Sequence, residues 1–230
     1  MKIHGLQKMT LLDYPGKVAC TVFFGGCDLR CPFCHNSDLL DVNAPALMEE
    51  DELLSFLKKR QGLLEGVCLT GGEPLMRPDL PELCRKIKTL GYPIKLDTNG
   101  FHPGPLRALI EEGLIDCAAM DIKNSPERYA MTCGRDPLDL APLKESIALL
   151  LEGRIDYEFR TTAVAEFHDD ASFAGIAELI RGAGKYFIQK FTDRDSVMFA
   201  GLHAPSKEDM LRWADIVKPS VGLAELRGTD

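Results

Sequence analysis

Residues 23–36, FFGGCDLRCPFCHN, place three cysteines in C-x3-C-x2-C spacing directly after an apolar run. The cysteines are Cys27, Cys31 and Cys34, and two glycines before them free the backbone to turn sharply. A short loop that brings three thiolates to one point can hold a soft metal centre. Iron–sulfur clusters usually take four cysteines. A [4Fe–4S] cluster held by this loop would therefore keep one iron open for a ligand that is not protein.

Two other uses of the cysteine loop have less support. A structural zinc site needs four ligands, and the only nearby fourth ligand is His35, which directly follows Cys34. Adjacent residues seldom chelate one ion well, so the spacing favours a cluster over zinc. A disulfide framework is disfavoured because the chain lacks secretory features and is long enough to fold without cross-links.

Length and composition predict a single domain over residues 1–230, with a core at about 17–192 and a C-terminal helix and tail at 193–230. The net charge of −8 argues against a nucleic-acid-binding surface. No apolar stretch approaches the roughly 20 residues that span a bilayer, and the N-terminus has no apolar signal region. Eight cysteines in such a chain suggest a reducing compartment. We therefore expect a cytoplasmic protein with no nucleic-acid or membrane partner.

Apolar segments and helical periodicity alternate along the chain. The expected strands are 17–24, 66–70, 93–98, 115–122, 157–164 and 186–191. The expected helices are 49–60, 80–90, 105–112, 140–152, 171–183 and 206–217, the last starting at the capping signal Ser206-x-x-Asp209. The apolar run after Pro219 is either a further strand or a packed tail.

Six strand–helix units in alternation indicate an α/β fold with a parallel sheet. No G-x-G-x-x-G follows the first strand, which weakens the dinucleotide-binding version of this fold. Six units are too few for a closed eight-unit barrel. The prediction is a partial parallel (β/α)6 TIM-like barrel.

Polar residues follow every later strand at the same end. They are Gly71, Gly72 and Glu73 of a GGEP motif, Asp97 and Asn99, Asp121 and Lys123, Arg160 and Thr162, and Gln189. Because side chains alternate along a strand, the two members of each charged or amide pair share a face. Buried charge is costly unless paired, so this edge predicts a polar ligand. Structural ion pairs at the barrel top remain the alternative.

S-adenosylmethionine (SAM) fits both the open iron and the polar edge. Its amino group needs carbonyl and carboxylate acceptors, which Gly71, Gly72 and Glu73 can provide. Its carboxylate needs a cation, and Arg160 or Lys123 can pair with it. Its ribose hydroxyls need Asn, Asp or Gln partners, which the strand ends also carry.

With these motifs in place, the chain resembles radical SAM enzymes, and among them the glycyl-radical-enzyme activating proteins. It is most similar to the longer type of anaerobic ribonucleoside-triphosphate reductase activating protein, with pyruvate formate-lyase activating enzymes near by. The motifs LLDYPGKVA, GGCDLRCPFCHN, LTGGEP, LDTNG and MDIK occur in the family's order. The aromatic Phe33 before the last cysteine is a specific feature. Asp28 stands where the family pattern predicts Asn, and Cys133 lies in a Tyr-x2-Thr-x-Gly stretch.

The resemblance implies a radical SAM barrel in which Phe33 and the polar strand ends bind the cofactor. It also implies that a reduced cluster cleaves SAM to a 5′-deoxyadenosyl radical, which takes the α-hydrogen of a glycine in a large partner enzyme. No catalytic side chain beyond the cluster and SAM is expected, and the electron donor would be a flavodoxin or a ferredoxin. The alternatives are an activator of a pyruvate formate-lyase-type enzyme, a small-molecule enzyme like 7-carboxy-7-deazaguanine synthase, and an iron–sulfur electron carrier.

The remaining cysteines have no C-x2-C pairing, which disfavours a second cluster. Cys20, Cys68 and Cys117 lie in predicted strands and Cys84 in a helix, where a small buried hydrophobic residue is the default interpretation. We expect His35 either to orient the cysteine loop or to cap its turn. Trp213 is expected in the core.

Overall fold

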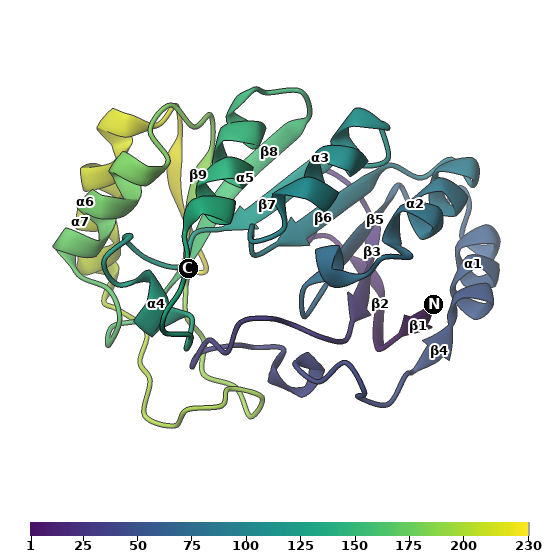
Figure 1. Cartoon of the computed structure of the whole chain (residues 1–230), viewed down its shortest axis with the longest axis horizontal. Coiled ribbons are helices and arrows are strands. Elements are labelled where there is room, and N and C mark those ends of the chain that lie inside the picture. Colours follow the sequence, from purple (N-terminus) through teal and green to yellow (C-terminus); the bar gives the residue numbers. More distant parts are fainter. Residues whose placement is uncertain (230) are drawn as a thin grey trace.

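The computed structural model describes residues 1–229 and centres on a curved, eight-stranded sheet (Figure 1). In spatial order the strands are β10 (Ala224–Arg227), β9 (Tyr186–Lys190), β8 (Asp156–Ala163), β7 (Cys117–Asp121), β6 (Ile94–Thr98), β5 (Gly66–Gly71), β3 (Ala19–Phe24) and β2 (Gly5–Thr10). Every neighbouring pair from β3 to β10 is parallel, and β2 is antiparallel to β3. The carboxyl ends of the parallel strands therefore meet at one edge.

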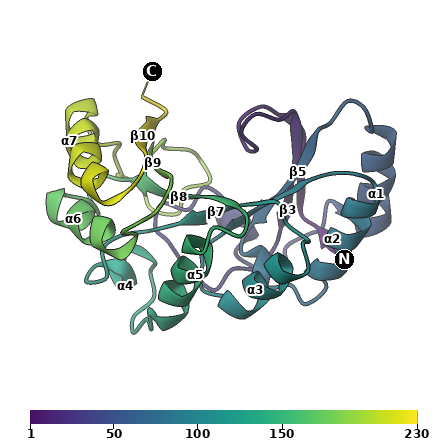
Figure 2. The ribbon, with the colours of Figure 1, turned by 90° about the horizontal axis from the view of Figure 1, so that it is seen from above.

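Helices cover the outer side of this sheet. They are α1 (Glu50–Lys59), α2 (Leu80–Thr89), α3 (Pro103–Glu111), the short α4 (Tyr129–Thr132), α5 (Ala141–Leu151), α6 (Asp170–Leu179) and α7 (Lys207–Val217). The short strands β1 (Lys2–Ile3) and β4 (Met48–Glu49) form a separate antiparallel pair. Seen from above, most helices lie along one side of the curved sheet, while the turn at 11–17 (purple) and β10 rise on the opposite side (Figure 2).

The predicted α/β fold, a partial parallel barrel, is confirmed, and its main sheet has two more strands than the six expected. The apolar run after Pro219 contributes the strand β10, so the strand alternative was the right one. Strand β2 was missed because its sequence, GLQKMT, mixes polar and apolar residues. Such a pattern is ordinary for an edge strand that is exposed along much of its length.

Alternation of apolar and charged side chains separates a helix-covered face of the sheet from a polar inner face. On β6, Ile94 and Leu96 are buried beneath the helices, whereas Lys95 and Asp97 point to the inner side. Helix α2 covers the apolar side with a stripe at heptad-like spacing, made of Leu80, Leu83, Cys84 and Ile87. The helices thus leave the inner face free for a ligand.

The last helix confirms two expectations. Ser206 accepts a hydrogen bond from the Asp209 N–H at 3.0 Å, as the capping signal predicted. Trp213 is buried and stacks on Phe173 with ring centroids 4.6 Å apart, so it belongs to the core. Its indole N–H donates to Asp170 at 2.8 Å.

The DYPG turn closes the amino-terminal end of the barrel. Tyr14 is buried and packs with Ala19 and Cys117. A Cβ on Gly66 would lie 2.9 Å from the Tyr14 ring, so only glycine leaves room for that ring. Within residues 1–229, no helix has both the length and the apolar character needed to cross a bilayer.

Candidate active site

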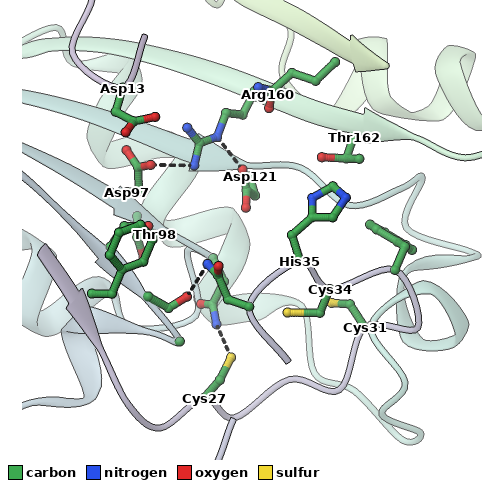
Figure 3. Close-up of a pocket in the computed structure, with 18 of the residues that line it drawn as sticks. Asp13, Cys27, Cys31, Cys34, His35, Asp97, Thr98, Asp121, Arg160 and Thr162 are labelled. Carbon is green, nitrogen blue, oxygen red and sulfur yellow. Dashed lines mark hydrogen bonds and ion pairs between the residues drawn. The ribbon is translucent and has the colours of Figure 1, made fainter. Parts of the chain in front are cut away.

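A cavity of about 690 Å³ opens at the carboxyl ends of the parallel strands, a typical size for a ligand site. Figure 3 shows part of its lining. The predicted site residues in its wall are Cys27, Cys31, Phe33, Cys34, Gly71, Gly72, Asp97, Asn99, Asp121, Lys123, Arg160 and Gln189. The fold therefore brings together segments that are up to 162 positions apart, from Cys27 to Gln189.

All three cysteines of the loop line this cavity. In the part of the chain that is described, no three His, Cys, Asp or Glu residues form a group suited to a single metal ion. The assignment of Cys27, Cys31 and Cys34 as cluster ligands stays a prediction. In a [4Fe–4S] cluster each cysteine binds a different iron, so thiols spread around a cavity wall fit a cluster.

The cysteine loop has hydrogen bonds of the kind that surround iron–sulfur clusters. The Leu29 N–H donates to Cys27 Sγ at 3.4 Å, and Asn99 Nδ2 lies 4.0 Å from the same sulfur. Arg30 holds the loop from outside by donating to the Cys27 carbonyl at 2.6 Å. Hydrogen bonds to the sulfurs are among the factors that set a cluster's reduction potential.

The thiols differ in acidity. A hydrogen bond from Cys133 lowers the pKa of Cys31 to about 7, against the effect of burial. Burial raises the pKa of Cys27 to about 12 and also raises the pKa of Cys34. Cys31 is therefore the thiol most readily deprotonated near neutral pH, the form in which cysteine binds metal. The sequence did not indicate a role for Cys133. Cys133 directly follows α4, and only the folded chain brings that helix to Cys31.

A chain of alternating charges crosses the inner face of the sheet (Figure 3). Arg160 Nε lies 2.6 Å from Asp121 Oδ1, and its terminal nitrogen lies 3.0 Å from Asp97 Oδ2. Lys123 Nζ pairs with the other Asp121 oxygen at 2.7 Å, and Lys95 pairs with Asp97. Although burial acts in the opposite direction, Arg160 and Lys123 hold the pKa of Asp121 well below its usual range.

These five groups carry three positive charges and two negative ones. Lys95 is not in the cavity wall, so Arg160 and Lys123 are the members of this network that can pair with an anionic group such as an amino-acid carboxylate. Lys95 was missed, although its position two residues before Asp97 already indicated the same face.

The position of Lys123 is fixed from two sides. Its backbone N–H donates to the Tyr129 hydroxyl at 3.1 Å. Its carbonyl oxygen lies 2.9 Å from His168 Nε2, and both His168 and Tyr129 are buried. Sequence reasoning did not single out either residue, because each acts only through the backbone of Lys123.

The GGEP loop depends on close backbone packing. Gly71 has φ +125°, and a Cβ there would lie 2.3 Å from the backbone of Phe24. A Cβ on Gly72 would lie 2.0 Å from the Gly26 carbonyl oxygen. Both positions require glycine, because the loop lies directly on the start of the cysteine loop.

Glu73 does not line the cavity, unlike the two glycines before it. Its carboxylate is fully buried and accepts hydrogen bonds from Leu75 N–H at 3.0 Å, Thr98 Oγ1 at 2.9 Å and Asn99 N–H at 2.7 Å. The predicted contact between Glu73 and the SAM amino group therefore lacks support. Glu73 instead joins the GGEP loop to the end of β6.

His35 connects the cysteine loop to the segment that follows β9. Its Nε2 lies 2.7 Å from the Thr192 carbonyl oxygen, and its ring stacks on Phe191. Phe199 N–H donates to the Pro32 carbonyl oxygen at 3.3 Å in the same region. Of the two roles considered for His35, this geometry favours orienting the loop. The segment also adds Thr192 and Arg194 to the cavity wall, and no sequence pattern marked them.

The other cysteines have the surroundings expected of core residues. Cys20, Cys68, Cys84 and Cys117 are buried and unpaired within the described chain. Burial raises the pKa of each thiol, most strongly for Cys68. These thiols are therefore poorly suited to reaction or to metal binding.

The chain is similar in sequence to a family profile and to several known proteins. Residues 21–180 match the sequence profile of the Radical SAM superfamily. A Methanocaldococcus jannaschii protein provisionally named glycyl-radical enzyme activating enzyme is 28% identical over 233 residues, 98% of this chain and 95% of that protein. The pyruvate formate-lyase-activating enzyme of Clostridium pasteurianum is 32% identical over 128 residues, 54% of this chain and 52% of that enzyme.

The fold is shared with a solved structure as well. A domain of pyruvate-formate lyase-activating enzyme from Bacteroides vulgatus superposes with a TM-score of 0.58 at 18% identity, covering 71% of this chain and 99% of that domain. The narrower resemblance, to anaerobic ribonucleotide reductase activating proteins, stays a prediction. The superfamily match spans most of the barrel and includes the cysteine loop. The chain belongs to the radical SAM superfamily, and it is an enzyme that uses a [4Fe–4S] cluster and S-adenosylmethionine.

Proposed function

We propose that this enzyme generates a radical on a glycine of a large partner protein, an anaerobic ribonucleoside-triphosphate reductase. When bound, the cluster and SAM supply the one-electron cleavage that produces a 5′-deoxyadenosyl radical, which removes the glycine α-hydrogen. The protein positions the two cofactors and excludes competing reactions. The proposal rests chiefly on one cavity in which three thiols face a polar strand edge that carries the cations Lys123 and Arg160.

The cofactors have matching residues in that cavity. Cys27, Cys31 and Cys34 would hold the cluster. The backbone of Gly71 and Gly72, in the cavity wall, would accept from the SAM amino group, and the cations Lys123 and Arg160 would bind its carboxylate. The other polar residues predicted to contact SAM keep supporting roles: Asn99 and Gln189 toward the ribose, Phe33 beside the last cysteine, and Asp97 and Asp121 holding the cations in place.

A protein substrate suits the open side of the barrel. The sheet ends at β2 on one side and β10 on the other, so the barrel is not closed. Between these ends the cavity wall includes Gln7 and Thr10 from one side and Gln189 and Arg194 from the other. A glycine loop entering there needs little room, because glycine has no side chain. The flanking amides also stabilise the radical that forms.

The partner and the electron donor follow from resemblance. The motifs most resemble the longer type of anaerobic ribonucleotide reductase activating protein, and a pyruvate formate-lyase-type partner is the nearest alternative. The full-length relative from M. jannaschii also bears the name of a glycyl-radical enzyme activating enzyme. We further propose a flavodoxin or ferredoxin as the donor, within the cytoplasm.

The test combines the reduced protein, SAM and a co-encoded glycyl-radical enzyme under strict anaerobiosis. Electron paramagnetic resonance should show a doublet on the partner protein. The doublet should collapse to a singlet when the α-position of that glycine is deuterated. Its splitting would then be assigned to the remaining α-hydrogen of one glycine.

Two results would contradict the proposal. Turnover of SAM on a purine-like small molecule, with no radical on any partner protein, would favour an enzyme like 7-carboxy-7-deazaguanine synthase. A cluster whose spectrum does not respond to added SAM would favour an electron carrier.

A further inference from the structure

Asp28 directly follows the first proposed cluster ligand, and both of its carboxylate oxygens have partners. Oδ1 accepts a hydrogen bond from Asn99 Nδ2 at 2.9 Å. Oδ2 lies 3.3 Å from His102 Nε2 and 3.8 Å from the Arg135 guanidinium. The side chain is mostly buried, so the carboxylate is held in place rather than free in solvent.

Two contacts, one to the Phe101 N–H and one to the Asp28 carboxylate, fix which way the Asn99 amide points. The amide oxygen of Asn99 accepts from the Phe101 N–H at 2.9 Å, so it cannot exchange places with the amide nitrogen. One N–H of the NH2 group is directed to Asp28 at 2.9 Å. The nitrogen also lies 4.0 Å from Cys27 Sγ, where its second N–H is available to the sulfur.

We propose that Asp28 is a positioning residue that sets the reduction potential of the cluster in two opposed ways. It holds the Asn99 amide toward Cys27, and an N–H donor at a ligand sulfur stabilises the reduced cluster, which raises the reduction potential. Its own negative charge, next to the ligand, destabilises the reduced cluster, which lowers the reduction potential. The inference rests on the proposed cluster ligands and does not depend on the glycyl-radical partner.

Two substitutions separate these effects. Asp28→Asn removes the charge but keeps an oxygen that can accept from Asn99. Asn is also the residue that the family pattern predicts at this position, so the variant should fold. Asp28→Ala removes the charge and the hydrogen-bond acceptor together. The matched control is Asp38→Asn, which removes one charge from the same segment at an exposed position.

The experiment is a redox titration of the reconstituted proteins without SAM or partner, followed by electron paramagnetic resonance. The midpoint potential of D28N should shift to a more positive value, and that of D28A should shift less, because the Asn99 amide loses one of the two contacts that hold it toward Cys27. D38N should match the wild type. A D28N midpoint equal to or below that of D38N would overturn the charge effect, and a D28A midpoint at or above that of D28N would overturn the positioning effect. A wild-type protein that takes up no cluster would overturn the ligand assignment, and this inference with it.

Discussion

The guanidinium of Arg160 lies 2.6 Å from the carboxylate of Asp121, at the level where β8 and β7 pair in register. The same guanidinium also reaches Asp97, so its plane is fixed before any ligand arrives. A cation held in this way loses little side-chain freedom when it binds an anion. The arrangement makes Arg160 both a structural ion-pair partner and a pre-positioned binding group.

Arg160→Ala should weaken SAM binding by roughly 1.5–3 kcal/mol, the range for hydrogen bonds to charged groups. Cluster content should stay unchanged. Equilibrium dialysis of SAM, with iron content measured in parallel, checks this. Arg181→Ala, which removes an exposed ion pair with Glu178, is the control and should bind SAM normally. Unchanged affinity in R160A would mean that Arg160 serves structure alone.

Replacing Cys27, Cys31 or Cys34 by Ala should abolish the charge-transfer absorbance of the anaerobically reconstituted protein. The wild type should bind about four irons per chain. Cys84→Ala should keep the full spectrum, because Cys84 is buried in α2 away from the cavity. A complete cluster in C31A would contradict the ligand assignment.

The stability of the fold should depend on pH through Glu73. Burial raises the pKa of Glu73 to about 7, above its ordinary value of about 4.3. The folded protein then binds a proton that the unfolded chain releases, so this stabilisation is complete below the ordinary pKa and lost as pH rises through about 7. Between about pH 5 and 8, the free energy of unfolding of the wild type should fall relative to that of Glu73→Gln.

Anaerobic denaturant unfolding at a series of pH values measures this difference. Titrating groups distant from Glu73 are common to both proteins and cancel in the comparison, whereas the pKa of His102 is raised in part by the Glu73 charge and shifts with it. Curves for wild type and E73Q that run parallel across this range would show that Glu73 stays ionised in the fold.

Tyr14→Ala should lower the free energy of unfolding by about 3 kcal/mol, because it removes the ring that closes the barrel end and leaves a cavity. Tyr14→Phe should cost less than about 1 kcal/mol, since the ring volume is kept. Leu12→Ala, two positions earlier but 86% exposed, should have almost no effect. Urea unfolding of the three variants tests whether the buried Tyr14 ring, and not the turn itself, stabilises this end of the barrel.

The strand ends were predictable because their geometry is local. Once a parallel sheet is inferred, the two-residue period alone puts Asp121 and Lys123 on one face and at one edge. The glycines of the GGEP motif were predictable for a related reason, since their need for space is a property of the backbone.

The residues that were missed or misplaced depend on contacts distant in sequence. The motif locates Glu73 but not the direction of its side chain, which is decided by three donors from β6 and its own loop. Arg194 lies in a segment without periodicity, and only its packing beside the cysteine loop brings it to the cavity. Strand β2 was hidden because half of an edge strand faces water and so lacks an apolar run.

The contacts between the cysteine loop and the segment after β9 constrain the order in which the enzyme can fold during synthesis. His35 bonds to Thr192, which lies 157 positions later in the chain, and Ser37 bonds to Ser196, 159 positions later. Protein synthesis proceeds from the N-terminus, so the three thiols leave the ribosome long before the residues that cover their loop exist. The cysteine loop therefore gains its full set of contacts only after residues 192–196 have been synthesised, and until then its thiols lack this cover.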